Sequence, residues 1–131
     1  MSFLIDTHIA VWIVDDSPML SRQARVALQG ARSDYFVSAA SIWEIAIKYM
    51  LRRGTNRDMR ISGFEAIAKF EASGFEILAI SALHAAEAGA LPLQHVDPFD
   101  RLMVAQAQLE GMRLLTHDSK LLAYGDFVEL V

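Results

Sequence analysis

Short apolar runs alternate with longer segments that carry helical capping residues. The runs are too short for helices and are bounded by polar or glycine positions, so we expect buried strands at 3–5, 35–37, 76–80, 113–116 and 127–131. Between them we expect helices at 9–13, 21–30, 41–53, 62–73, 81–90, 97–110 and 120–124. Apolar strands that alternate with helices predict an α/β fold, with three α/β/α layers and a mostly parallel central sheet.

Capping residues give the predicted helix bounds. Ser21, Ser62 and Ser81 stand where N-caps are expected. Asp97 and Pro98 suit the start of the long late helix, because Asp caps well and Pro fits the first turn. Repeats, low-complexity tracts and linkers are all lacking, so we expect residues 1–131 to form one domain.

Two acidic residues follow predicted strands directly. Asp6 comes after the run 3–5, and Asp118 follows the strand 113–116. In a parallel sheet both positions lie at the carboxyl edge, where such folds keep their sites. Either acid could instead be an ordinary helix N-cap. Having both favours a site, and clustered carboxylates are tolerated mainly when a cation neutralises them.

The helix predicted at 41–53 is apolar except along one line. Its polar residues Ser41, Glu44, Lys48 and Arg52 recur at the spacing of a single helix face. We expect this polar face to line a cleft and Glu44 to belong to the site. Two plainer interpretations stay open, a capping box of Ser41 with Glu44 and a surface ion pair of Glu44 with Lys48.

Two further acids begin the late helix, Asp97 at the N-cap and Asp100 at N3. Capping explains Asp97 fully, whereas the helix dipole explains Asp100 only weakly, at ~0.3–1 kcal/mol. We therefore expect Asp100 to turn its carboxylate towards Asp6 and Asp118, and keep Asp97 as a possible ligand.

Between positions 48 and 60 bases greatly outnumber acids. Lys48, Arg52, Arg53, Arg57 and Arg60 stand there against the single acid Asp58. The stretch could be a solvated helix end. The alternative is a set of phosphate contacts beside the acidic site, with Lys48, Arg52 and Arg53 as substrate-binding candidates.

The histidines lack any recognised metal-ligand spacing. His8 and His117 lie close to predicted site acids and could form the rim of the site, whereas we expect no special role for His84. The chain has no cysteine, which excludes disulfides and thiolate metal sites. The apolar runs are far shorter than a membrane span, and no export signal is visible, so we expect a cytoplasmic protein.

Carboxylate oxygens without sulfur favour Mg²⁺ or Mn²⁺ over zinc, and such a site suits phosphodiester hydrolysis. One alternative is a metal-dependent phosphatase of small phosphate esters, in which the basic stretch would be idle. Another is a non-catalytic RNA-binding or protein-binding domain, although a binder of polyanions gains nothing from clustered acids. The net charge of −4 argues mildly against general polyanion binding.

Four strings in this order resemble the PIN-domain ribonucleases, and within them the VapC-like toxins of toxin–antitoxin pairs. The strings are Leu4-Ile5-Asp6-Thr7-His8, Ser38-Ala39-Ala40-Ser41-Ile42-Trp43-Glu44-Ile45, His95-Val96-Asp97-Pro98-Phe99-Asp100-Arg101 and Leu115-Thr116-His117-Asp118. The resemblance implies that Asp6, Glu44, Asp100 and Asp118 surround Mg²⁺ or Mn²⁺, with Thr116 as a polar neighbour and Asp97 as the rival of Asp100. It also implies RNA hydrolysis, a homodimer and a partner antitoxin that docks on the toxin.

Overall fold

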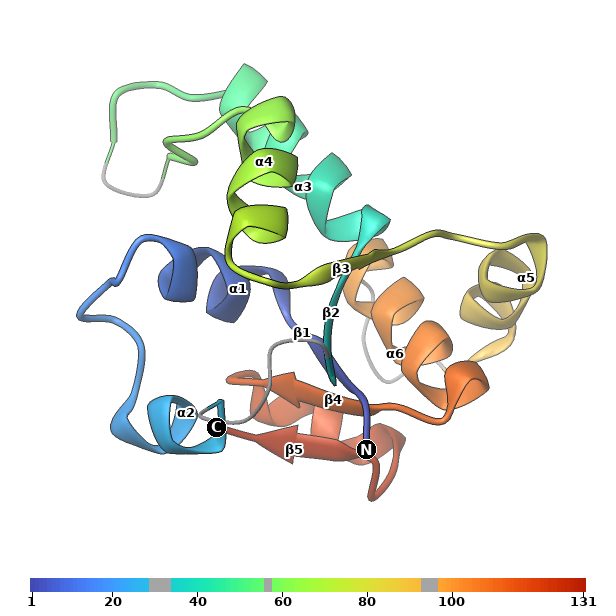
Figure 1. The fold of residues 1–131 in the computed structure, drawn as a ribbon. Helices are drawn as coiled ribbons and strands as arrows, with labels where there is room; N and C mark the ends of the chain where they lie inside the picture. The colour runs from blue at the N-terminus through green and yellow to red at the C-terminus, as the bar shows by residue number, and fades with distance from the viewer. Residues whose placement is uncertain (29–33, 56–57, 93–96) are drawn as a thin grey trace.

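The computed structural model describes residues 1–28, 34–55, 58–92 and 97–131. Its strands are β1 (Phe3–Ile5), β2 (Tyr35–Ser38), β3 (Glu76–Leu78), β4 (Arg113–Thr116) and β5 (Val128–Leu130). They form one sheet in the order β3-β2-β1-β4-β5, and all four pairings are parallel (Figure 1). The predicted α/β class with a mostly parallel sheet is confirmed.

The helices lie close to their predicted positions. They are α1 (Thr7–Val14), α2 (Arg22–Ala27), α3 (Ala39–Met50), α4 (Gly63–Ala72), α5 (Ala82–Ala90), α6 (Pro98–Glu110) and the 3-10 helix η2 (Ser119–Tyr124). The N-caps Ser21, Ser62, Ser81 and Asp97 all accept backbone hydrogen bonds as expected. The predicted end of the second helix at Gly30 lies outside the described residues. Among the described residues no helix is long and apolar enough to cross a membrane.

Alternating side chains on the central strands divide the core between the two faces of the sheet. Ile5 and Leu115 pack in a cluster with α1, α2, α3 and α4. Their strand neighbours Leu4 and Leu114 pack in a second cluster, with α6 and η2. These four side chains are fully buried, as expected of central parallel strands covered on both faces. Figure 1 shows the resulting layers, with α1 and α2 on one side of the sheet and α5 and α6 on the other.

Helix α3 differs from its predicted form in two respects. It begins at Ala39, because the Ser38 hydroxyl accepts the capping hydrogen bond from the Ala40 amide. It is also less buried than its apolar sequence indicated, since Trp43 is 62% exposed and Met50 71% exposed. The sequence pattern correctly marked a polar stripe on α3, but much of the apolar remainder faces outward.

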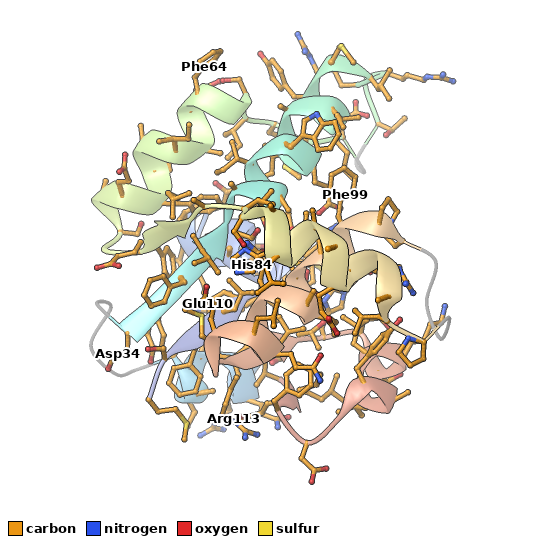
Figure 2. The ribbon with its side chains drawn as sticks, turned by 90° about the vertical axis from the view of Figure 1, so that its right-hand side faces the viewer. Asp34, Phe64, His84, Phe99, Glu110 and Arg113 are labelled. Carbon is orange, nitrogen blue, oxygen red and sulfur yellow. The ribbon has the colours of Figure 1, made fainter. Side chains whose placement is uncertain are left out.

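His84 has a structural role that the sequence interpretation missed. The residue is 4% exposed, and its Nδ1 accepts a hydrogen bond from the Ser81 amide at the start of α5. Its Nε2 lies 3.0 Å from Oε1 of Glu110 at the end of α6. Figure 2 shows His84 on α5 together with Glu110 on α6. His84 therefore caps α5 and fixes that helix against α6.

Candidate active site

The candidate site lies at the carboxyl edge of the central strands. The chain continues from β1 to its neighbour β2, whereas β4 pairs with the opposite side of β1. This reversal of strand order creates the crevice in which open α/β sheets bind ligands. Asp6 follows β1 directly, and Asp118 lies two residues beyond β4. The sheet therefore brings the two acids to one edge, as predicted.

Asp6 occupies the N-cap position of α1, but its side chain makes no capping hydrogen bond. The carboxylate instead accepts a 2.6 Å hydrogen bond from the Thr116 hydroxyl, which comes from the end of β4. Asp6 is 4% exposed and Thr116 is fully buried. The interpretation of Asp6 as an ordinary N-cap is therefore wrong, and its carboxylate faces the neighbouring strand.

Burial raises the pKa of Asp6 above its ordinary value. The hydrogen bond from Thr116 and the neighbouring rings of His8 and His117 oppose this effect, while the charge of Glu44 adds to it. The pKa of His8 is lowered, first by burial and then by the charge of Lys48. Both shifts favour the neutral form of the side chain. A cation beside the buried Asp6 carboxylate would stabilise its ionised form.

Thr116 connects Asp6 to Asp118. Its hydroxyl donates to Asp6 and accepts a 3.0 Å hydrogen bond from the Asp118 amide. The Asp118 carboxylate also caps η2 by accepting from the Lys120 amide at 3.0 Å. The N-cap interpretation of Asp118 therefore holds in the structure, and it does not remove the side chain from the edge of the site.

Glu44 is buried at 6% exposure on the polar face of α3. Lys48, one turn later, donates a 2.9 Å hydrogen bond to its Oε2, so the predicted ion pair is present. The second oxygen, Oε1, is buried and has no hydrogen-bond partner in the described part of the chain. A capping box with Ser41 is excluded, because α3 begins at Ala39, two residues before that serine, and its N-cap is Ser38.

The fold holds α3 in place through hydrogen bonds that the sequence did not reveal. The Thr7 hydroxyl of α1 donates to the Ser41 hydroxyl at 2.8 Å, and both residues are buried. The Ser41 hydroxyl in turn donates to the Met103 sulfur of α6 at 3.6 Å. These contacts join the helices that carry the acids. Small hydroxyl side chains in helix sequences give no signal of such long-range pairing.

Asp97 is the N-cap of α6, as predicted, and Asp100 stands in the first turn of that helix. Asp97 Oδ1 accepts hydrogen bonds from the Phe99 amide at 2.9 Å and the Asp100 amide at 3.4 Å. Asp100 stands in the first turn of α6, and both carboxylates line the same cavity. The geometry commits one oxygen of Asp97 to capping.

The acids meet around one cavity of about 390 Å³, called here the acid cavity. Its lining residues are Asp6, His8, Glu44, Lys48, Asp97, Asp100, His117, Asp118 and Ser119. A larger cavity of about 830 Å³ lies beside it and shares the lining residues His8 and Lys48. All five predicted ligand acids thus line a single cavity, and His8 and His117 lie at it, where the sequence suggested a rim.

The carboxylates have the donor chemistry of a site for Mg²⁺ or Mn²⁺ but are not gathered around one point. Among the described residues, no three His, Asp or Glu side chains are arranged to hold a metal ion as they stand. Lys48, the Thr116 hydroxyl and backbone amides instead take up several of the oxygens. Glu44 Oε1, which has no hydrogen-bond partner among the described residues, is the observation that fits an additional cation, because a buried carboxylate oxygen without a partner is costly.

The predicted substrate-binding bases occupy different places. Lys48 lines both cavities, and Arg60 lines the larger one. Arg52 is exposed beyond the end of α3, where its guanidinium lies 3.9 Å from the centre of the Tyr49 ring. Arg53 is also exposed and is not among the residues that line either cavity. The structure thus brings only Lys48 of the three predicted bases to the acids.

The PIN domain model matches residues 3–126, which is nearly the whole chain. The chain belongs to the PIN domain family. The family resemblance stated from the four strings is therefore confirmed. None of the curated proteins compared with the chain matches it.

Several solved structures share this PIN fold. A chain of a toxin–antitoxin complex from Klebsiella pneumoniae is similar with a TM-score of 0.66 and 22% identity, over 98% of this chain and 96% of that one. A chain of DNA-bound VapBC from Salmonella typhimurium is similar with a TM-score of 0.69 and 15% identity, over 98% of this chain and 97% of that one. A chain of FitAcB from Neisseria gonorrhoeae is similar with a TM-score of 0.69 and 16% identity, over 98% of this chain and 96% of that one. At these identities the similarity establishes the fold.

Proposed function

We propose that this PIN domain is a Mg²⁺-dependent or Mn²⁺-dependent endoribonuclease and the toxin component of a toxin–antitoxin pair. The observation that carries the proposal is the acid cavity, where carboxylates from four separate segments meet at the carboxyl edge of the sheet. Two neighbouring cavities that share the lining residues His8 and Lys48 suit a polymer better than a small phosphate ester. The clustered acids also argue against a purely RNA-binding role.

The metal-holding residues in this proposal are Asp6, Glu44, Asp100 and Asp118, with Asp97 kept to its capping role. When bound, the metal supplies Lewis-acid stabilisation of the phosphate and eases deprotonation of the attacking water. Thr116 positions Asp6 and Asp118 through its two hydrogen bonds. Lys48 holds Glu44 through Oε2 and lies close enough to contact a substrate phosphate.

The proposed reaction is hydrolysis of an RNA phosphodiester. The water oxygen forms a bond to phosphorus, the bond from phosphorus to the 3′ oxygen breaks, and that oxygen leaves with a proton. The products are 5′-phosphate and 3′-hydroxyl ends. The water proton passes to one of the carboxylates that line the acid cavity, Glu44 or Asp118.

The proposed partners are an RNA substrate, a cognate antitoxin and a second copy of the chain, in the cytoplasm. The structural similarity to chains of toxin–antitoxin complexes supports the antitoxin. Exposed apolar side chains support protein contacts, since Trp43 and Met50 on α3 and Phe64 on α4 all face solvent. Phe64 is 89% exposed and extends from the upper end of α4 in Figure 2.

The test is cleavage of total RNA by the purified protein, with Mg²⁺ or with EDTA. We expect cleavage with Mg²⁺ only, and a loss of at least about 100-fold in Asp6→Asn, since one preorganised electrostatic group typically contributes that much. Asp16→Asn is the matched control, because Asp16 is highly exposed and its positive φ of 48° suits Asn. Equal cleavage by Asp6→Asn, or cleavage in EDTA, would contradict the proposal.

A further inference from the structure

Three aromatic rings gather at the junction of the two cavities. His8 and Trp12 come from α1, and His117 follows β4. The centre of the Trp12 ring lies 5.1 Å from that of His117 and 6.1 Å from that of His8. The two histidine rings are 5.7 Å apart. These spacings are those of packed aromatic pairs, so the three form one cluster, called here the ring platform.

The ring platform extends from the acid cavity into the larger cavity. His117 lines the acid cavity, Trp12 lines the larger one, and His8 lines both. Trp12 and His8 are only partly buried, and His117 is exposed. A ligand that reaches from one cavity into the other therefore passes these rings.

The larger cavity offers a cationic side chain, Arg60, to an anionic group. The two acids in its lining make polar contacts within the chain. Asp58 accepts hydrogen bonds from the amides of Arg53 and Thr55, and Asp15 lies 3.8 Å from the Lys69 ammonium. Arg60, which lines the same cavity, makes no ion pair with a described residue. The volume of about 830 Å³ is within the range of ligand pockets.

We propose that the ring platform binds the nucleobase next to the scissile phosphate, with the base stacked on Trp12 and the following phosphate near Arg60. The proposal rests on the proposed RNA cleavage in the acid cavity. Aromatic rings accept any base by stacking, which contributes about 5-fold to 150-fold in affinity per base, whereas a cation holds the backbone. Trp12 would thus decide where on the RNA the acids act, without taking part in the chemistry.

The test is a double-mutant cycle that removes the Trp12 ring, the RNA base, or both, and compares the resulting values of kcat/KM. Once the cleavage position is mapped, each flanking nucleotide of a short RNA is made abasic in turn. For one of them we expect kcat/KM of the wild type to fall about 5-fold to 150-fold. The same abasic RNA should lower kcat/KM of Trp12→Leu less than about 2-fold, because the stacking partner is already gone.

Two further variants guard against misfolding and general damage. Trp12→Phe keeps a ring where Trp12 packs on the core, so it should retain part of the response to the missing base. Trp43→Leu is the matched control, because Trp43 is the chain's other tryptophan and contacts Phe99 on α6. This control should respond to the abasic RNA as the wild type does.

Fluorescence gives an independent readout. In a Trp43→Phe background Trp12 is the sole tryptophan, and we expect RNA bound in Ca²⁺ to quench its emission, with the quenching lost for the abasic RNA. If the wild type cleaves RNA but losses from Trp12→Leu and the abasic site multiply independently, the stacking proposal is wrong. That result would leave the larger cavity to a protein partner. If the wild type cleaves no RNA at all, the proposed function itself fails.

Discussion

Replacing Thr116 by Val should destabilise the protein through the Asp6 carboxylate. Val has nearly the shape of Thr and suits strand β4, so the main change is loss of one hydroxyl. That hydroxyl donates at 2.6 Å to a carboxylate that is itself 4% exposed. A hydrogen bond to a charged group contributes about 1.5–3 kcal/mol. We therefore expect Thr116→Val to lower the free energy of unfolding of the metal-free protein by about that amount at pH 7.

The loss should depend on pH in a definite direction. Burial raises the pKa of Asp6 in the folded state. Asp6 therefore contributes most to the stability of the folded state at pH values below its pKa in the unfolded chain. That contribution falls as the pH rises through the pKa that Asp6 has in the folded state. The variant lacks the hydrogen bond that favours the ionised form, so its Asp6 pKa should be higher still. The difference between wild type and Thr116→Val should shrink at acidic pH towards the ~0.5–1.5 kcal/mol of a neutral hydrogen bond.

Urea unfolding of the metal-free protein at pH 7 and at pH 4 measures both effects. Thr116→Ser is the control, because it keeps the hydroxyl and loses one buried methyl, at a pH-independent cost of ~0.8 kcal/mol. A Thr116→Val loss that is equal at the two pH values would refute the link to Asp6. So would a variant as stable as the wild type at pH 7.

Four further variants test the proposed metal ligands and the predicted bases. Asp100→Asn should lose most of the cleavage activity and Asp97→Asn little, because Asn caps a helix about as well as Asp; the reverse order in a cleavage assay would make Asp97 the ligand. Lys48→Met should lower the unfolding free energy of the metal-free protein by about 1–3 kcal/mol, because its glutamate partner stays buried, and millimolar Mg²⁺ should restore most of the loss in a thermal melt. Replacing Arg52 and Arg53 together by Gln should weaken RNA binding and flatten its salt dependence; an unchanged salt slope would mean that these exposed bases do not contact RNA.

The sequence was most informative where a residue's role is local. A Ser or Asp before a helix forms its hydrogen bond within the same turn, so Ser62, Ser81 and Asp97 were identified correctly. Strand positions followed from buried apolar runs, and parallel pairing then fixed the edge that carries Asp6 and Asp118. The acids could be found because their placement depends on strand ends rather than on side-chain packing.

Side-chain contacts between residues that are distant in sequence could not be predicted from the sequence. Ser41 was expected at the start of α3 but lies inside the helix and bonds to Thr7. The contact of His84 with Glu110 gave no sequence signal, because Glu110 lies in another helix. Trp12 reads as one more apolar residue of α1 until His117 is placed beside it. In each case the partner is distant in sequence, and no local pattern identifies it.

Calorimetric titration of the metal-free protein with Mn²⁺ tests the central claim, that the acid cavity holds a divalent cation. We expect saturable binding by the wild type and by the control Asp16→Asn, and loss of that binding in Asp6→Asn. A hundredfold excess of metal over the dissociation constant should also stabilise the wild type by ~2.7 kcal/mol. No binding by the wild type at millimolar Mn²⁺, or equal binding by Asp6→Asn, would contradict the account.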